Sequence, residues 1–144
     1  MLRFSRWLAC AIHSKLESSL YFANTRLATR GGFAIDNLTL SNIAERVLKN
    51  YAEYPCAAAG VETRLLFDRE RDQYALVTLG WEGVHHHYSV VAHLEIINDR
   101  IYIQEDNTEE GIATDLEAAG VPKHQIVLGF RHPQLRPFTE YAAA

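Results

Sequence analysis

The 144-residue sequence is poor in the residues that mark several large classes of protein. It has two cysteines, four prolines, eight glycines and one methionine. Two cysteines provide no disulfide framework, so a reducing cytoplasm is the simplest setting. No uncharged run is long enough to span a membrane, and Trp7 to Ile12 is too short for the core of an export signal. We therefore expect a cytoplasmic protein without a membrane segment.

Motifs for nucleotides and metals are also lacking. Gly80 and Gly83 do not make a phosphate loop, and there is no Walker sequence, dinucleotide fingerprint or zinc-finger spacing. We accordingly expect no cofactor and no structural metal.

The acidic charge of the chain is unevenly distributed. The net charge is −4, yet residues 1–35 carry five basic groups and one acid, which leaves 9 basic and 17 acidic groups in residues 36–144. A surface that tracks phosphates needs clustered lysine and arginine. Direct DNA binding by this acidic part is therefore not expected, and its charge suits a basic protein partner.

The length fits one folded domain, residues 37–144, preceded by a basic extension of residues 1–36. Two interpretations of the extension are open. It is either a basic arm that contacts DNA or a loosely ordered upstream segment that arises from the choice of start codon.

Helical spacing of apolar residues predicts a helix over residues 39–54, capped by Thr39 or Ser41 and ended by Pro55. A second helix is expected over residues 109–119, with Asn107 and Glu110 as a capping box and Gly120 at its end. A short apolar segment, residues 126–128, follows, and the tail from His132 is expected to be extended.

Alternating and apolar runs predict four strands at residues 61–68, 74–81, 88–97 and 100–104. The second is apolar on both faces, which indicates a central strand. Asn98 and Asp99 tolerate the positive φ of a two-residue hairpin turn. The fold class is therefore α+β, an antiparallel meander of about four strands with an N-terminal helix and a second helix after the last long hairpin.

The last hairpin sorts its residues onto two faces. A two-residue turn pairs Ile97 with Arg100, Glu95 with Tyr102 and His93 with Gln104. One face is apolar, and the opposite, polar face carries His93, Glu95, Arg100, Tyr102 and Gln104. This polar face is consistent with a recognition surface, with general acid–base chemistry by His93 and Glu95, or with an ordinary solvated sheet face.

Two further clusters have simple structural interpretations. His85, His86 and His87 adjoin a turn, so we expect an exposed polar loop; on a strand, only His85 and His87 could share a metal. The acids of residues 106–110 could bind a metal, but they also suit the start of a helix.

An ordered series of motifs resembles the XisI-like family, the fdxN element excision controlling factors. It covers residues 37–144 and runs through these segments: Glu70–Val77 with Gly80-Trp81, His93–Ile96, Asp99–Gln104, Asp106–Ala113, Leu116, Gly120–Lys123, Ile126–Phe130, and His132-Pro133 with Arg136, Thr139 and the terminal alanines. Residues 1–36 have no counterpart in the family. Ile35-Asp36-Asn37-Leu38 stands where family members tend to begin, which favours an upstream start as the origin of the extension.

The resemblance implies a role in developmentally controlled excision of a DNA element, together with a XisH-like companion that resembles restriction-type nucleases. It implies no catalytic role for the chain, and many such pairs occur away from any excised element. We expect a non-catalytic protein-binding module, able to form homo-oligomers. The candidate partner contacts are His93, Glu95, Tyr102, Gln104, Arg136, Phe138 and Tyr141. The alternative is a small hydrolase or nuclease subunit that uses His93 with Glu95 or Asp106.

Overall fold

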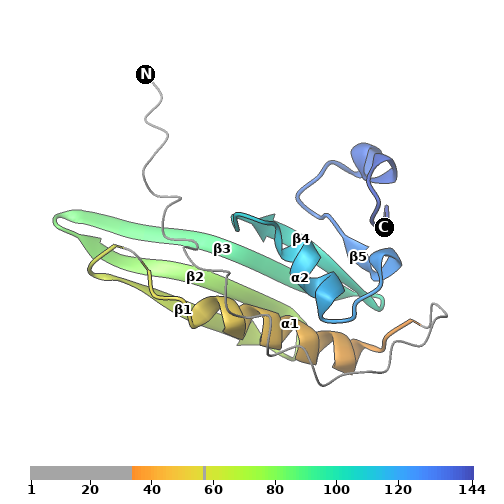
Figure 1. Ribbon diagram of the computed structural model, residues 1–144, viewed down its shortest axis with the longest axis horizontal. Coiled ribbons are helices and arrows are strands. Elements are labelled where there is room, and N and C mark those ends of the chain that lie inside the picture. The colour runs from red at the N-terminus through yellow and green to blue at the C-terminus, as the bar shows by residue number, and fades with distance from the viewer. Residues whose placement is uncertain (1–33, 57) are drawn as a thin grey trace.

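The computed structural model describes residues 34–56 and 58–144 (Figure 1). Most of the predicted basic extension, residues 1–33, lies outside these residues. In chain order the elements are the helix α1 (Asn37–Ala52), the strands β1 (Val61–Asp68), β2 (Gln73–Glu82), β3 (His85–Ile97) and β4 (Arg100–Asp106), the helix α2 (Ile112–Ala118), the 3₁₀ helix η3 (Lys123–Gln125), the strand β5 (Ile126–Val127) and the 3₁₀ helix η4 (Pro133–Phe138). The predicted α+β class is confirmed.

The sheet has the strand order β1-β2-β3-β4-β5. Its first four strands form the antiparallel meander that the sequence predicts. Asn98 and Asp99 make the predicted turn with φ values of 49° and 57°. The fifth strand was not predicted: Ile126 and Val127 pair parallel with β4, next to Ile101 and Tyr102. Two residues are too few to show the alternation by which a strand is recognised in a sequence.

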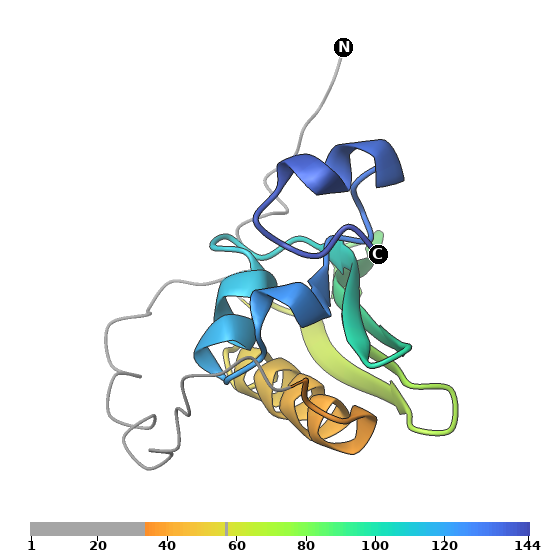
Figure 2. The same cartoon turned by 90° about the vertical axis from the view of Figure 1, so that its right-hand side faces the viewer.

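Both α-helices cover the same face of the sheet (Figure 2). The core between them contains Leu40, Ala44, Leu48, Leu94, Ile101, Ile103, Ile112 and Leu116, each fully buried. The predicted apolar face of the hairpin, from Ala92 to Ile103, belongs to this core. Within residues 34–56 and 58–144, no α-helix covers the opposite face of the sheet, which we call the helix-free face. No helix in the described part of the chain is long and apolar enough to cross a bilayer.

The helix α1 begins two residues earlier than predicted because a different residue caps it. The carboxylate of Asp36 accepts a hydrogen bond of 2.8 Å from the Thr39 backbone N–H. This bond satisfies one of the donors that the first turn of a helix leaves unpaired. Ser41, a predicted cap, instead lies inside the helix, where its hydroxyl donates to the Asn37 carbonyl.

The predicted start of the second helix is also wrong. Gly111, with φ of 84°, occupies the N-cap position before Ile112. It makes no side-chain hydrogen bond to the first turn of the helix. Asp106 acts from a distance: its carboxylate accepts from the Ile112 N–H at 2.8 Å and from the Thr108 hydroxyl at 2.6 Å. Asn107 donates to the Val90 carbonyl instead of capping. The acids before α2 therefore include one that organises the helix start.

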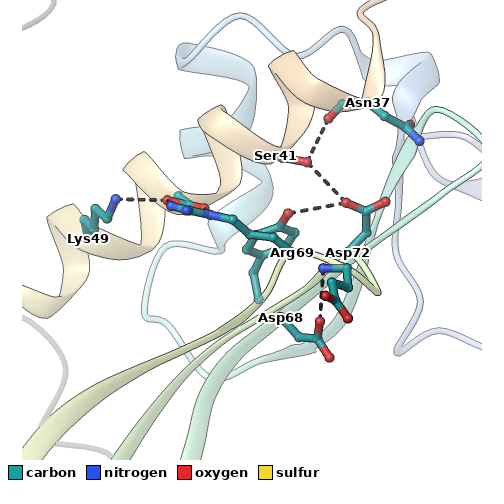
Figure 3. A network of polar contacts seen from close by, with 9 residues as sticks. Asn37, Ser41, Lys49, Asp68, Arg69 and Asp72 are labelled. Atoms are coloured by element: carbon teal, nitrogen blue, oxygen red, sulfur yellow. Dashed lines mark hydrogen bonds and ion pairs between the residues drawn. The ribbon is translucent and has the colours of Figure 1, made fainter.

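Polar contacts fasten α1 to the turn between β1 and β2 (Figure 3). Arg69 donates two hydrogen bonds to the Glu45 carboxylate, at 2.5 and 2.9 Å, and Lys49 donates a third at 3.0 Å. The Ser41 hydroxyl, which donates to Asn37, also lies 3.3 Å from the Asp72 carboxylate. The Arg69 hydrogen bond, with a smaller contribution from Lys49, lowers the pKa of the buried Glu45 to about 2. The helix is thus attached by charge as well as by its apolar stripe.

The tail begins with the 3₁₀ helix η4, where the sequence had predicted an extended segment from His132 onward. Pro133 starts η4, where its fixed φ suits the first turn, and the His132 side chain accepts from the Gln134 N–H. Beyond η4 the chain returns to the sheet, where the Ala142 N–H donates to the Ile126 carbonyl at 2.9 Å. Lys123 pairs with Glu140 and approaches Glu117, which closes the tail against α2.

Candidate partner-binding site

A chain of side-chain hydrogen bonds crosses the helix-free face of the sheet. We name Gln73, His93, Glu95 and Gln104 the amide network. The register places Gln73 of β2 opposite Glu95 of β3, and Glu95 opposite Tyr102 of β4. The four side chains of the network and that of Tyr102 are all half-buried. Three of the seven predicted partner contacts therefore belong to one connected cluster, and Tyr102 lies beside them.

The amide network occupies both oxygens of the Glu95 carboxylate. His93 Nε2 donates to Gln73 Oε1 at 2.7 Å, and Gln73 Nε2 donates in turn to Glu95 Oε1 at 2.5 Å. Gln104 Nε2 donates to Glu95 Oε2 at 2.7 Å. Each amide is thus oriented by the carboxylate that it binds. This arrangement holds the Glu95 side chain in one position on the sheet.

Among the residues that the structure describes, the two glutamine amides are the groups that bind the Glu95 carboxylate. None of the ion pairs within residues 34–56 and 58–144 includes Glu95. An oriented carboxylate of this kind can accept a charge-assisted hydrogen bond from a lysine or arginine of another molecule. The site is therefore suited to recognition of a basic group.

The pairing of His93 differs from the predicted one. Ile97 faces Arg100 and Glu95 faces Tyr102, as expected, but His93 faces Glu105 because the register shifts between His93 and Leu94. The shift leaves Gln104 as the extra residue of a β-bulge in β4. A bulge re-aims a side chain and strengthens the local twist. Gln104, the extra residue, donates its hydrogen bond to Glu95 across the strand pair.

The segment between β5 and η4 approaches the network at Gly129. A Cβ atom at Gly129 would lie 2.7 Å from Gln104 Oε1 and 2.9 Å from the Ile103 carbonyl oxygen. Arg136 holds the adjoining backbone, since its guanidinium donates to the Gly129 carbonyl at 3.2 Å and to the Arg131 carbonyl at 3.0 Å. Arg136, a predicted partner contact, thus positions the tail beside Gln104.

The two aromatic candidates of the tail have different environments. Phe138 is 87% exposed, and Leu135, three residues earlier in η4, is 53% exposed. A 3₁₀ helix has three residues per turn, so these two side chains lie on one side of η4. Tyr141 packs against the core and donates a hydrogen bond of 2.5 Å to Glu117 of α2. The structure therefore groups Phe138 with Leu135 and places Tyr141 elsewhere.

The structure places the two residue pairs of the enzymatic alternative differently. Asp106 pairs with Ala92, whose side chain lies in the core, so Asp106 faces the helices while His93 faces the opposite side. His93 and Glu95 share a face, but the Gln73 amide stands between them. The two side chains therefore do not hydrogen-bond to each other directly.

The three histidines belong to β3 and not to the predicted loop. His85, His86 and His87 pair with Glu82, Trp81 and Gly80. The His86 ring packs on Trp81 with 4.9 Å between centroids, and His87 Nε2 lies 2.8 Å from Thr78 Oγ1. Within residues 34–56 and 58–144, no group of three or more His, Cys, Asp or Glu side chains could hold a metal ion.

A family model described as XisI protein matches residues 36–143. The chain belongs to the XisI family. Two solved structures from Anabaena variabilis ATCC 29413 support the assignment. A XisI-like protein is 32% identical with a TM-score of 0.72, and the fdxN element excision controlling factor XisI is 34% identical with a TM-score of 0.66. Each alignment covers 76% of this chain and 100% of the other. No curated protein matches.

The sequence interpretation missed two residues of the site. Gln73 was recognised only as part of a family motif, although it links His93 to Glu95. Gly129 was likewise named for the family alone. The pairing of β2 with β3 would have placed Gln73 beside Glu95, but the bend that brings Gly129 to Gln104 has no local signal.

Proposed function

We propose that this XisI-family chain is a non-catalytic accessory factor that helps control excision of a DNA element by binding a XisH-like, nuclease-related companion. The companion docks on the helix-free face of the sheet, over the amide network and Tyr102, with η4 beside it. The name of one XisI structure, an fdxN element excision controlling factor, supports the excision role. The family assignment supports the same reaction context.

The observation that carries this proposal is the oriented Glu95 carboxylate. Two amides hold it, while no described cation neutralises it. A basic side chain of the companion would complete the site, and the acidic charge of residues 36–144 would steer a basic surface toward it.

The side of η4 that carries Leu135 and Phe138 supplies the apolar part of the proposed interface. Such an arrangement, with exposed apolar anchors next to polar groups, is common at protein–protein interfaces. Arg136 stabilises the anchor by tying η4 to Gly129. The proposed contacts thus combine one charged centre with one apolar ridge.

The test is retention of the full-length chain by a tagged XisH-like companion at low and high salt. Glu95→Gln keeps the shape of the side chain but removes its charge, and we expect at least a tenfold loss of affinity, since charge-assisted contacts contribute roughly 1.5–3 kcal/mol. Glu109→Gln, on an exposed residue between β4 and α2 that is outside the network, serves as the matched control and should retain binding. Equal binding by wild type and Glu95→Gln would contradict the proposed site.

His93→Ala separates the binding function from the enzymatic alternative. If His93 helps to hold Gln73, the substitution weakens retention by the companion but leaves any nuclease activity of the companion alone unchanged. Turnover by the isolated chain that disappears in His93→Ala would instead establish catalysis.

A further inference from the structure

The strand β1 forms one edge of the sheet, at the opposite side from β5 and the tail. Its pairing with β2 is continuous from Val61 to Asp68, without a bulge. It contains no proline and no lysine, two of the residues with which proteins protect an edge strand. A regular edge of this length is a template for another strand.

The hydrogen-bond pattern identifies which backbone groups face outward. The Trp81 N–H donates to the Gly60 carbonyl, so the alternation of an antiparallel ladder directs Glu62, Arg64 and Leu66 toward β2. Thr63, Leu65 and Phe67 then direct their backbone groups away from the sheet.

Few contacts occupy this outer edge. Within residues 34–56 and 58–144, the Val61 N–H donates to the Ala58 carbonyl, and the Arg64 guanidinium lies 3.5 Å from the Thr63 carbonyl. The latter contact is at the limit of a hydrogen bond and comes from an exposed side chain that can move aside. The outer groups of Thr63 and Leu65 are therefore suitable for strand pairing.

The side chains of β1 favour one particular pairing. Glu62 and Arg64 lie two residues apart on the helix-free face, are both exposed and contact each other. When two copies of β1 run antiparallel about an axis at Thr63, each Glu62 faces the Arg64 of the other copy. On the helix-bearing face, Val61 then meets Leu65, an apolar pair.

Neighbouring registers are less favourable. An axis at Arg64 places two arginines opposite each other, and an axis at Leu65 places Glu62 opposite Asp68. Like charges directly opposite each other destabilise a strand pair. The Thr63 axis satisfies both charge and apolar pairing.

We propose that two copies of this chain associate through β1, antiparallel and about a two-fold axis at Thr63, to form one continuous sheet. The companion site proposed above uses side chains of β2, β3 and β4 and the tail, and none of the outward backbone groups of β1 that form this dimer. The inference does not depend on that site, because it concerns the opposite edge of the sheet.

The test measures the oligomeric state of the full chain by sedimentation equilibrium. A single strand pair makes a small interface, so we expect micromolar association that is visible at about 100 µM. Glu62→Arg and Arg64→Glu each place like charges across the junction and should weaken the dimer roughly tenfold. The double variant Glu62→Arg with Arg64→Glu should restore it.

Two controls separate the junction from general effects. Glu109→Arg changes the charge by the same amount as Glu62→Arg, at an exposed residue before α2, and should leave the dimer unchanged. Thr63→Pro removes an outward N–H and should give a folded monomer, because an edge strand tolerates proline there. The circular dichroism spectrum of each variant verifies that it is folded.

Other outcomes would overturn the proposal. A wild-type chain that is monomeric at this concentration excludes the dimer. A dimer that persists in Thr63→Pro and in both single charge variants uses a different surface. The wild type could also be monomeric while the Thr63→Pro variant is no longer retained by the companion. That result would show that β1 receives a strand from the companion instead.

Discussion

Gly129 lies against Gln104 so closely that a Cβ atom added to it would stand 2.7 Å from the side-chain oxygen. Gln104 is also the residue that binds Glu95 Oε2. The segment between β5 and η4 therefore contacts the amide network, and the small size of residue 129 allows Gln104 to remain in place.

Gly129→Ala should weaken companion binding without unfolding the chain. The added methyl group displaces Gln104, and it presses on the Ile103 carbonyl, which accepts from the Phe130 N–H. We expect a loss of about 1–3 kcal/mol in the free energy of unfolding. Gln104→Ala is the comparison, because it removes the amide without crowding. If both variants bind the companion as wild type does, Gln104 does not position Glu95 for binding.

Glu45→Gln should give a pH-dependent loss of stability. The Arg69 hydrogen bond lowers the Glu45 pKa from its ordinary value of 4.5 to about 2 in the folded chain. The stabilisation is therefore fully present above about pH 4.5 and is lost as the pH falls toward 2. Arg69 is 73% exposed, so solvent reduces the effect to about 1 kcal/mol at pH 7.

Urea unfolding at pH 7 and pH 3 measures this effect. The difference between wild type and Glu45→Gln should shrink at the lower pH. Glu109→Gln, on an exposed side chain, should show little difference at either pH. A difference that stays constant with pH would show that the Glu45 charge is not the cause.

Gly80→Ala should destabilise the chain more than Gly83→Ala. A Cβ atom at Gly80 would collide with the Gly60 carbonyl and the Val61 Cα, where β1 meets β2, whereas a Cβ at Gly83 meets nothing within 4 Å. Gly83→Ala has only the strain of a positive φ, about 1–2 kcal/mol. We expect a loss of about 3 kcal/mol or more for Gly80→Ala, because backbone atoms cannot move aside readily. Thermal unfolding of both variants would reveal equal losses if this backbone contact were unimportant.

Tyr141→Phe should loosen the tail while the rest of the domain stays folded. The Tyr141 hydroxyl donates a hydrogen bond to Glu117. Burial, as the larger cause, and this hydrogen bond, as the smaller one, raise the pKa of Tyr141. Loss of the bond should reduce stability by about 1 kcal/mol. The loosened tail should also be cleaved faster after Arg131 and Arg136 by a protease that cuts after arginine. Mass spectrometry of the fragments measures the cleavage rate. Unchanged cleavage rates would mean that Ala142 and Lys123 hold the tail without Tyr141.

Much of the architecture could be predicted from local pattern. The apolar spacing of Ile43, Val47 and Leu48 predicted a helix, and all three lie on the buried face of α1. Alternation in β3 and β4 predicted which side chains enter the core, and Asn98-Asp99 predicted the turn. These features depend on neighbours in the chain, because helix and strand periodicity decide which side chains share a face.

The candidate site was determined only in part by the sequence. His93, Glu95 and Tyr102 were placed on one face by strand alternation alone. Gln73, the bulge at Gln104 and the approach of Gly129 required the tertiary structure. Each of them depends on how distant segments align, and a shift of one residue in a strand pair changes which side chains meet. The sequence thus determined the faces of the sheet, whereas packing between segments decided which polar groups on the open face bind one another.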